Sequence, residues 1–262
     1  MSRVAPALVV LAGDRGPDDP LARSAGVAGK VLVEVAGRPM LAHVLETISQ
    51  LDAARRMLVC PRRAEYLELA AAGGIDEVIE PATGPAASVM AALARLDADA
   101  PVLVVTGDHP LLRPEWLTGF IDKAAATGAD AVVGVADYRA IAQAFPGSRR
   151  TRYRFADVEA CGTNLFWFNG TGGRAVAGLW QSFEADRKRP WRIVARLGPV
   201  NLMRYLLGRL TLADAMAALS ARLGCRLGAV VIDTPEAAVD VDSPADLALV
   251  REIFRGRERQ DR

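Results

Sequence analysis

The sequence predicts an α/β fold of three layers, in which helices cover both faces of a mostly parallel sheet. Over the first 135 residues, short apolar runs typical of strands alternate with segments whose apolar residues recur at helical spacing. The run from Val102 to Thr106 is apolar on both faces, as expected of a strand that lies between two layers of helices. The chain has 262 residues, of which 51% are hydrophobic, so it can bury a large core and is not intrinsically disordered.

The predicted elements of the first half follow one another as βαβ units with right-handed crossovers. The strands are predicted at Ala7–Leu11, Met57–Cys60, Glu77–Ile79, Val102–Thr106 and Ala131–Val135. The helices between them are predicted at Met40–Leu51, Ala64–Ala72, Ser88–Leu96 and Trp116–Ala126. Small ligands of such sheets bind at the carboxyl ends of the strands, so we expect a site in the loops after Leu11, Ile79 and Thr106.

The alternation stops after about residue 137, where an inserted helical subregion is predicted. The segment from Tyr138 to Phe155 is irregular and basic. A strand is predicted at Asn164–Phe168 and a helix at Gly172–Arg187. Two or three short helices, broken at Gly198-Pro199, are predicted within Trp191–Gly224. A last strand at Ala229–Ile232 and a C-terminal helix that ends near Phe254 complete the chain. We predict a single domain over residues 1–262.

Charge and cysteine content exclude several classes of protein. The 32 basic and 31 acidic residues leave a net charge of +1, so a nucleic acid is not an expected partner. The three cysteines are widely spaced and show no CxxC pair, which argues against a disulfide framework or a structural zinc site. The first apolar run is too short to span a membrane and lacks a signal peptide's cleavage region. These features favour a cytoplasmic protein.

The loop after the first predicted strand contains Leu11-Ala-Gly13 and continues to Lys30. Backbone N–H groups and a lysine in such a loop can surround phosphate groups. A Walker A loop is excluded, because Ser24 and Val31 stand where that motif needs a glycine and a hydroxyl residue. The alternative is an ordinary loop with a solvated lysine.

A carboxylate follows the strand that is apolar on both faces. Asp108 lies in the segment Thr106-Gly-Asp-His-Pro110, at the carboxyl edge of the predicted sheet. There it could hold a Mg²⁺ ion that neutralises phosphate oxygens. The alternative is an Asx turn that stops the strand, since Asp and Pro are common turn residues.

Two more carboxylates precede the last predicted helix. Asp240 and Asp242 would repel each other unless a cation or backbone donors compensate them, so a metal is a reasonable partner. Ser243 and Asp246 form a near capping box, which explains those two residues as a helix start. It leaves Asp240 and Asp242 unexplained.

A loop of small residues follows the strand predicted at Glu77–Ile79. Gly84 would allow close backbone approach, and the hydroxyl of Ser88 suits recognition of a flat base edge. The alternative is a loop that leads into a helix.

In this order, the four motifs resemble those of the MobA-like nucleotidyltransferase family, with its Rossmann-like, GT-A-type fold. The resemblance covers roughly residues 5 to 135 and 228 to 255, and its most specific part is Lys30 followed by Gly37-Arg-Pro-Met40. It implies transfer of a nucleoside monophosphate from an NTP to a phosphorylated sugar, polyol or cofactor precursor, with release of pyrophosphate. It also implies Mg²⁺ as the cofactor.

The resemblance implies a role for each matched residue. Lys30, Asp108 and Asp242 are the implied catalytic residues, and the two carboxylates are the implied Mg²⁺ ligands. The implied nucleotide-binding residues are Leu11, Ala12, Gly13, Arg15, Lys30, Gly84, Pro85, Ser88 and Gly107. The nucleotide-binding part is thus expected at about 1–135 with 228–255, and the acceptor or insert region at about 137–227.

The middle of the chain, where the resemblance gives little, should recognise the acceptor. Arg149, Arg150 and Arg152 are candidates for an acceptor phosphate, because guanidinium groups pair well with phosphate oxygens. The alternative is a solvated basic face. Thr163 and Asn164 could bond hydroxyls of a sugar or polyol, or could form an edge turn instead.

The basic segment Arg187–Arg192 is followed by the apolar-rich segment Leu197–Leu212. Together they could dock on an anionic membrane surface, or pack within the chain or against a second copy. We favour packing, so a homodimer is expected before a membrane partner.

Two other functions are compatible with these motifs. A GT-A-type glycosyltransferase usually shows Asp-x-Asp at the strand end, and Thr106-Gly-Asp108 lacks the first aspartate. A catalytically inactive nucleotide-binding regulatory protein is suggested by the first loop. The family has a Gly-Gly pair followed by Arg and Gly, whereas Asp14 follows Gly13 here, and either Arg15 or Arg23 would fill the arginine's role.

Overall fold

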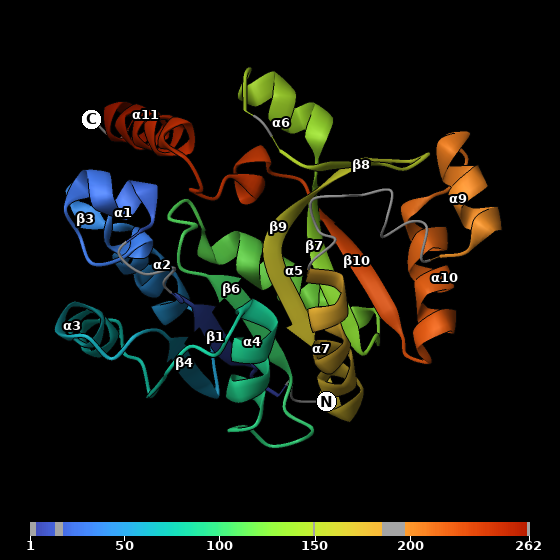
Figure 1. Ribbon diagram of the computed structural model, residues 1–262, viewed down its shortest axis with the longest axis horizontal. Coiled ribbons are helices and arrows are strands. Elements are labelled where there is room, and N and C mark those ends of the chain that lie inside the picture. The colour runs from blue at the N-terminus through green and yellow to red at the C-terminus, as the bar shows by residue number, and fades with distance from the viewer. Residues whose placement is uncertain (1–3, 14–17, 149, 185–196, 261–262) are drawn as a thin grey trace.

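The computed structural model describes residues 4–13, 18–148, 150–184 and 197–260. In these residues a sheet of eight strands forms the centre of the molecule, and helices cover both of its faces (Figure 1). The strands of this sheet are β1 (Ala7–Leu11), β4 (Arg55–Val59), β5 (Glu77–Ile79), β6 (Val102–Thr106), β7 (Ala131–Asp137), β8 (Arg152–Arg154), β9 (Glu159–Phe168) and β10 (Leu227–Ile232). Two short strands, β2 (Glu34–Val35) and β3 (Arg38–Pro39), form an antiparallel pair of their own. The predicted α/β class is confirmed.

The order along the sheet is β5-β4-β1-β6-β9-β7-β10, with β8 paired to β9. β1 runs parallel to β4 and β6, β4 to β5, and β7 to β10. Only β9 among the strands of this path is antiparallel to its neighbours, β6 and β7. All the parallel strands therefore end at the same edge of the sheet, where the sequence predicts the site.

Helices form one layer on each side of the sheet. On one face lie α2 (Met40–Ser49), α3 (Ala64–Ala72) and α5 (Pro114–Ala126), and on the other lie α4 (Pro85–Leu93), α7 (Gly170–Glu184) and α10 (Leu212–Leu223). The remaining helical segments are α1 (Pro20–Ala25), η1 (Lys30–Leu32), α6 (Tyr138–Ala144), α9 (Pro199–Leu206), η2 (Pro235–Ala238) and α11 (Pro244–Gln260).

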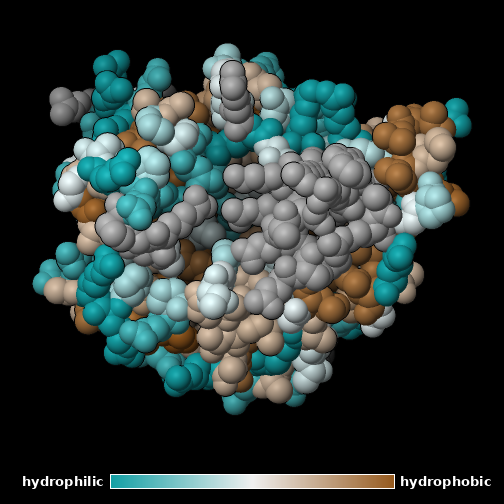
Figure 2. Space-filling view, viewed as in Figure 1, coloured by the Kyte–Doolittle hydropathy of each residue, from teal (hydrophilic) through white to brown (hydrophobic). Residues whose placement is uncertain are grey.

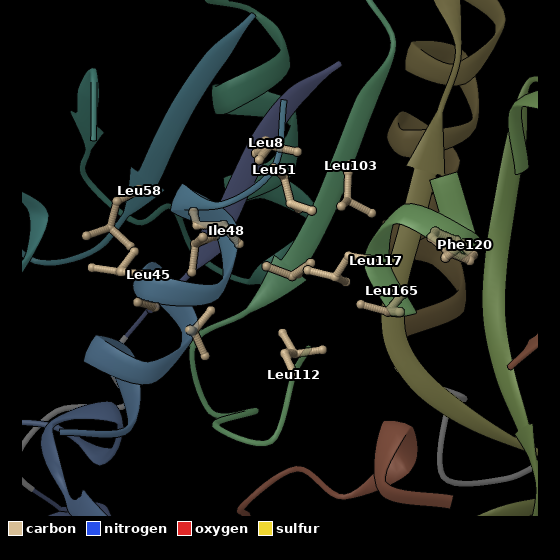
Figure 3. Close-up of a cluster of buried hydrophobic side chains, with 14 of the residues drawn as sticks. Leu8, Leu45, Ile48, Leu51, Leu58, Leu103, Leu112, Leu117, Phe120 and Leu165 are labelled. Carbon is tan, nitrogen blue, oxygen red and sulfur yellow. The ribbon is translucent and has the colours of Figure 1, made fainter. Parts of the chain in front are cut away.

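The main core lies between the sheet and the layer of α2, α3 and α5 (Figure 3). Alternation along β1 sends Leu8 and Val10 into this core, whereas Val9 faces the second core under α4 and α7. Burying a leucine or isoleucine side chain contributes about 1.5–3 kcal/mol, so these two cores hold the strand ends in place. A rigid sheet edge is what a precisely positioned site requires.

The second half of the chain differs from the prediction in three places. The predicted strand Asn164–Phe168 begins earlier, at Glu159, and completes the sheet between β6 and β7, so this region is not only helical. The segment Tyr138–Phe155, predicted to be irregular, contains α6 and β8, and β8 forms because it pairs with β9. The C-terminal helix continues past Phe254 to Gln260, and the arginines of its last turn suit a helix C-terminus.

Within the described parts of the chain, no helix is both long enough and apolar enough to cross a membrane.

Candidate active site

Backbone hydrogen bonds bring three distant loops together at the carboxyl edge of the sheet. The N–H of Gly107, just after β6, donates to the carbonyl of Leu11 at the end of β1, with an N···O distance of 2.8 Å. The N–H of Val241, just before α11, donates to the carbonyl of Asp108 at 2.9 Å. Gly107 also leaves no room for a side chain, because an added Cβ would lie 3.1 Å from the side chain of Leu41. Asp108 is thereby held beside the segment that carries Asp242.

His109 links the loop after β6 to the segment before α11. Its side chain is buried, and its Nε2 lies 3.1 Å from the carbonyl oxygen of Glu236 in η2. Burial lowers the pKa of His109 to about 4, so the ring is neutral at pH 7. This histidine therefore supports the loop and adds no charge to the site.

Lys30 bridges the two predicted catalytic carboxylates. Its Nζ donates to Asp108 Oδ2 at 2.5 Å and to Asp242 Oδ1 at 2.7 Å, although these residues lie 78 and 212 positions away in the sequence. Burial alone would lower the pKa of Lys30, but the charges and hydrogen bonds of the two carboxylates raise it above its ordinary value. Lys30 is therefore a permanent cation between two anions.

Asp240 stands next to this bridge and is held from two sides. Asn164 on β9 donates from Nδ2 to Asp240 Oδ2 at 2.9 Å, and Arg150 donates from its guanidinium to Asp240 Oδ1. Asn164 adopts a left-handed backbone conformation with φ of 56°, which Asn tolerates better than most residues. Burial, and next the neighbouring charge of Asp108, raise the pKa of Asp240.

The acidic cluster of Asp108, Asp240 and Asp242 fits a hard divalent cation. One carboxylate oxygen of each residue lies within 4.8 Å of the other two. Both oxygens of Asp240 already accept hydrogen bonds, whereas Asp108 Oδ1 is buried and accepts none among the described residues. Oxygen donors are those that Mg²⁺ prefers, and an unsatisfied buried carboxylate oxygen suits a cation ligand. Of the three, Asp108 therefore has the oxygen that best suits a cation, and Asp242 is the most exposed.

Arg150 does not face an open acceptor site. Its side chain is only 9% exposed and lies between two carboxylates, with Nη2 donating to Asp246 Oδ1 at 2.7 Å in addition to the bond with Asp240. Its donors hold the start of α11 in place, and the role as a phosphate clamp stays a prediction. Arg152 pairs instead with Glu159 at 3.3 Å and is 38% exposed. Arg149 lies outside the described residues.

Thr163 and Asn164 lie on opposite faces of β9. Asn164 faces Asp240, whereas Thr163 is buried against Gly134 of β7, where an added Cβ would lie 2.5 Å from Thr163 Oγ1. Thr163 therefore packs against the neighbouring strand, whereas Asn164 faces the acidic cluster. Their role in acceptor binding stays a prediction.

The predicted base-binding loop forms a helix start. Gly84 precedes α4, Pro85 is its first residue, and the buried hydroxyl of Ser88 accepts a hydrogen bond from the N–H of Ala82 at 3.0 Å. The hydroxyl thus orders the loop rather than facing outward. Gly13, at the end of β1, is exposed, and Arg15 lies outside the described residues.

Two contributions to the site were not assigned from the sequence. Asp240 was expected only to need a compensating cation or backbone donors, and Arg150 was given to the acceptor. Asp246 was predicted to belong to the start of the last helix. Its N–H donates to Ser243 Oγ at 3.2 Å, as a helix start requires, and its carboxylate also pairs with Arg150. The only sequence signal for the Asp240 role is its place two residues before Asp242.

Comparisons with known proteins agree with this architecture. Over 132 residues the chain shares 33% identity with the bifunctional protein GlmU of Sphingopyxis alaskensis, a match that covers 50% of this chain and 28% of GlmU. The chain therefore spans less than a third of the curated relatives it matches. A hypothetical transferase from Thermus thermophilus superposes with a TM-score of 0.76 and 31% identity, over 93% of this chain and all of the other.

A CMP:2-keto-3-deoxy-manno-octonic acid synthetase in complex with CTP shares the fold, with a TM-score of 0.59 and 16% identity over 97% of this chain and all of the other. The family model that matches most of the sequence defines the class of protein as the NTP transferases. Within that class, the chain belongs to the family of the MobA-like NTP transferase domain, whose sequence model matches residues 8–226.

Proposed function

We propose that this protein transfers a nucleoside monophosphate from an NTP to a phosphorylated small molecule and releases pyrophosphate. The acceptor class is a sugar, a polyol or a cofactor precursor. Membership of the family supports the type of reaction. The observation that carries the proposal is the meeting of Lys30, Asp108 and Asp242 at the carboxyl edge of the sheet.

The reaction needs little acid or base from the protein. A phosphate oxygen of the acceptor forms a bond to the α-phosphorus of the NTP, and the bond from that phosphorus to the bridging oxygen of pyrophosphate breaks. The acceptor phosphate is already anionic near neutral pH, so no side chain has to remove a proton from it. Positioning and neutralisation of charge are the remaining requirements.

Lys30 and the carboxylates divide these requirements between them. Asp108 and Asp242 would hold Mg²⁺, which when bound neutralises phosphate oxygens and orients them. The raised pKa of Lys30 keeps this side chain charged near neutral pH, so it can stabilise the negative charge that develops during transfer. Asp240, held by Arg150 and Asn164, fixes the segment on which Asp242 lies.

The test is pyrophosphate release from each of the four NTPs, with a panel of phosphorylated sugars and polyols, with and without Mg²⁺. We expect release only with one class of acceptor, and a nucleotide-linked product in the mass spectrum. Release that is as fast without an acceptor would indicate hydrolysis instead of transfer. Binding of NTP with no turnover for any acceptor would favour the inactive nucleotide-binding alternative.

A matched pair of variants ties the activity to the site. Asp108→Asn should abolish pyrophosphate release. Asp97→Asn changes an exposed aspartate beyond the amino end of β6, at the opposite edge of the sheet, and should leave it unchanged. Equal rates for the two variants would exclude Asp108 from catalysis.

A further inference from the structure

Helix α9 (Pro199–Leu206) carries a stripe of exposed apolar side chains. Val200, Met203, Leu206 and Leu207 are 70%, 58%, 68% and 60% exposed. Their spacing of three, three and one residues places them along one side of the helix. We call these four residues the outer face of α9. Together with Val4, they are the most exposed large apolar side chains in the described part of the chain.

The opposite side of α9 is already packed against the protein. Leu202 and Tyr205 contact a small core that contains Leu197, Leu210 and Ala215. Tyr205 OH also accepts a hydrogen bond from the N–H of Arg154 at 3.0 Å. The fold therefore needs only one side of α9 to be apolar. An apolar outer face on a helix that is already docked indicates a second binding partner.

Arginines flank the outer face at both ends. Arg209 is exposed just beyond the C-terminal end of α9, and the guanidinium of Arg222 lies 3.5 Å from the position of a Cβ on Gly198, at the N-terminal end. Arg204 is paired with Asp214 at 2.5 Å, which cancels the charge of both. Among the described residues, Arg209 and Arg222 form no ion pair with an acidic side chain.

The sequence around α9 is strongly cationic. Between Asp186 and Asp214 there is no other Asp or Glu, and the basic residues besides the paired Arg204 are Arg187, Lys188, Arg189, Arg192, Arg196 and Arg209. This local excess contrasts with the whole chain, whose net charge is only +1. An apolar helix face flanked by Arg209 and Arg222, in a cationic stretch of the sequence, is the pattern of an interfacial helix that lies on an anionic bilayer.

We propose that the outer face of α9 docks on an anionic lipid surface. The apolar side chains would enter the boundary between headgroups and acyl chains, and Arg209 and Arg222 would contact lipid phosphates. Figure 2 shows brown atoms at the right-hand end of the molecule, where Figure 1 places α9 and α10. The helices α1 and α3 lie at the other end, so docking would leave the nucleotide-binding half away from the bilayer.

A second copy of the chain fits this face less well. In a symmetric dimer the same patch meets itself, so the flanking arginines of both copies would lie close together in a medium of low dielectric constant. A standard interface also uses about 20–30 residues from each partner, far more than this stripe provides. Although the sequence favoured packing against a second copy, the exposed apolar side chains and flanking arginines of α9 agree better with docking on an anionic membrane.

The experiment is sedimentation of the full chain with vesicles of phosphatidylcholine alone or with an equal share of phosphatidylglycerol. We expect binding to the anionic vesicles only, with at least tenfold weaker binding in 0.5 M NaCl because salt screens the arginines. Met203→Glu with Leu206→Glu should weaken binding to the anionic vesicles at least tenfold. Thermal unfolding of this double variant should match that of the wild type, because both side chains face outward.

The control is Leu67→Glu with Leu179→Glu, which replaces two partly exposed leucines on α3 and α7 and should not change vesicle binding. Equal binding to both kinds of vesicle, or none to either, would overturn the proposal. So would a dimer in light scattering that the Met203→Glu, Leu206→Glu variant dissociates, because the outer face would then be an interface between copies.

Discussion

Lys30 shows how one side chain can serve both the folded state and the reaction. It neutralises two carboxylates that would otherwise repel each other, and this lets Asp108 and Asp242 lie close together without a ligand. In the proposed reaction the same ammonium would stabilise the phosphates of the NTP.

Replacing Lys30 should therefore affect the reaction far more than the fold. We expect Lys30→Ala to lower the rate of transfer about 10²- to 10³-fold, the usual effect of one lost preorganised electrostatic contact. Lys123→Ala is the control, because Lys123 is exposed and has only a 3.5 Å pair with Asp233. Steady-state pyrophosphate release checks both. A Lys30→Ala enzyme with unchanged turnover would remove this residue from the site.

Arg150 and Arg152 lie two positions apart, and the same change should destabilise the protein far more at Arg150 than at Arg152. Arg150→Ala leaves two largely buried carboxylates without their partner, and we expect a loss of about 3 kcal/mol in the free energy of unfolding. Arg152→Ala breaks a half-exposed pair, and we expect a loss of about 0–1 kcal/mol. Urea denaturation measures both values.

The kinetics of these variants separate positioning from acceptor binding. If Arg150 acts by holding Asp240, kcat should fall while the acceptor KM changes little. A selective rise in the acceptor KM of Arg150→Ala, with normal stability, would instead support its predicted role as a phosphate clamp.

At the scale of elements, helix α7 packs unusually close to the end of β9. A Cβ added to Gly173 would lie 2.7 Å from the carbonyl oxygen of Asp130 and 3.0 Å from the backbone of Phe168. Backbone atoms cannot move aside as flexible side chains can. The absence of a side chain at this position therefore sets the distance between α7 and the sheet.

Two glycines of α7 should give opposite results when changed to alanine. Gly173→Ala should destabilise the protein by about 1–3 kcal/mol through overpacking. Gly178→Ala meets no atom within 4 Å and should stabilise it by about 0.5–1 kcal/mol, because alanine favours the helix. Thermal or urea unfolding distinguishes the two. Equal effects would contradict the close approach of α7 described above.

Strong periodic patterns predicted the long elements, and local patterns failed where a distant partner decides the structure. The bounds of β1, β5, β6 and α3 agree with the sequence prediction, since each has a clear apolar pattern and a clear stop. β8 has no such pattern and forms because of its ladder with β9. The pair β2 and β3 consists of two residues each, too short to give a periodic signal.

At the scale of the whole molecule, the topology of the sheet explains what could be predicted of the site. Parallel strands end at one edge, so the loops that carry Lys30, Asp108 and Asp242 were expected to meet, and the geometry is compatible with that expectation. The role of Arg150 could not be predicted, because its two partners lie 90 and 96 positions away. The different surroundings of Thr163 and Asn164 could not be predicted either, because they depend on the register of β9 in the sheet.

The central claim is that Asp108 and Asp242 act on one reaction as a unit, and a double-mutant cycle tests it most directly. Asp108→Asn and Asp242→Asn should each nearly abolish pyrophosphate release at saturating NTP, acceptor and Mg²⁺. The double variant should be little slower than either single one, because residues that share one task are strongly non-additive.

Thermal unfolding of all three variants, with Asp97→Asn as the control, ensures that a folded protein is compared in every case. Non-additive losses of this kind are the result that we expect. Losses that multiply in the double variant, or a single variant that keeps wild-type turnover, would contradict the claim that the two carboxylates share one catalytic site.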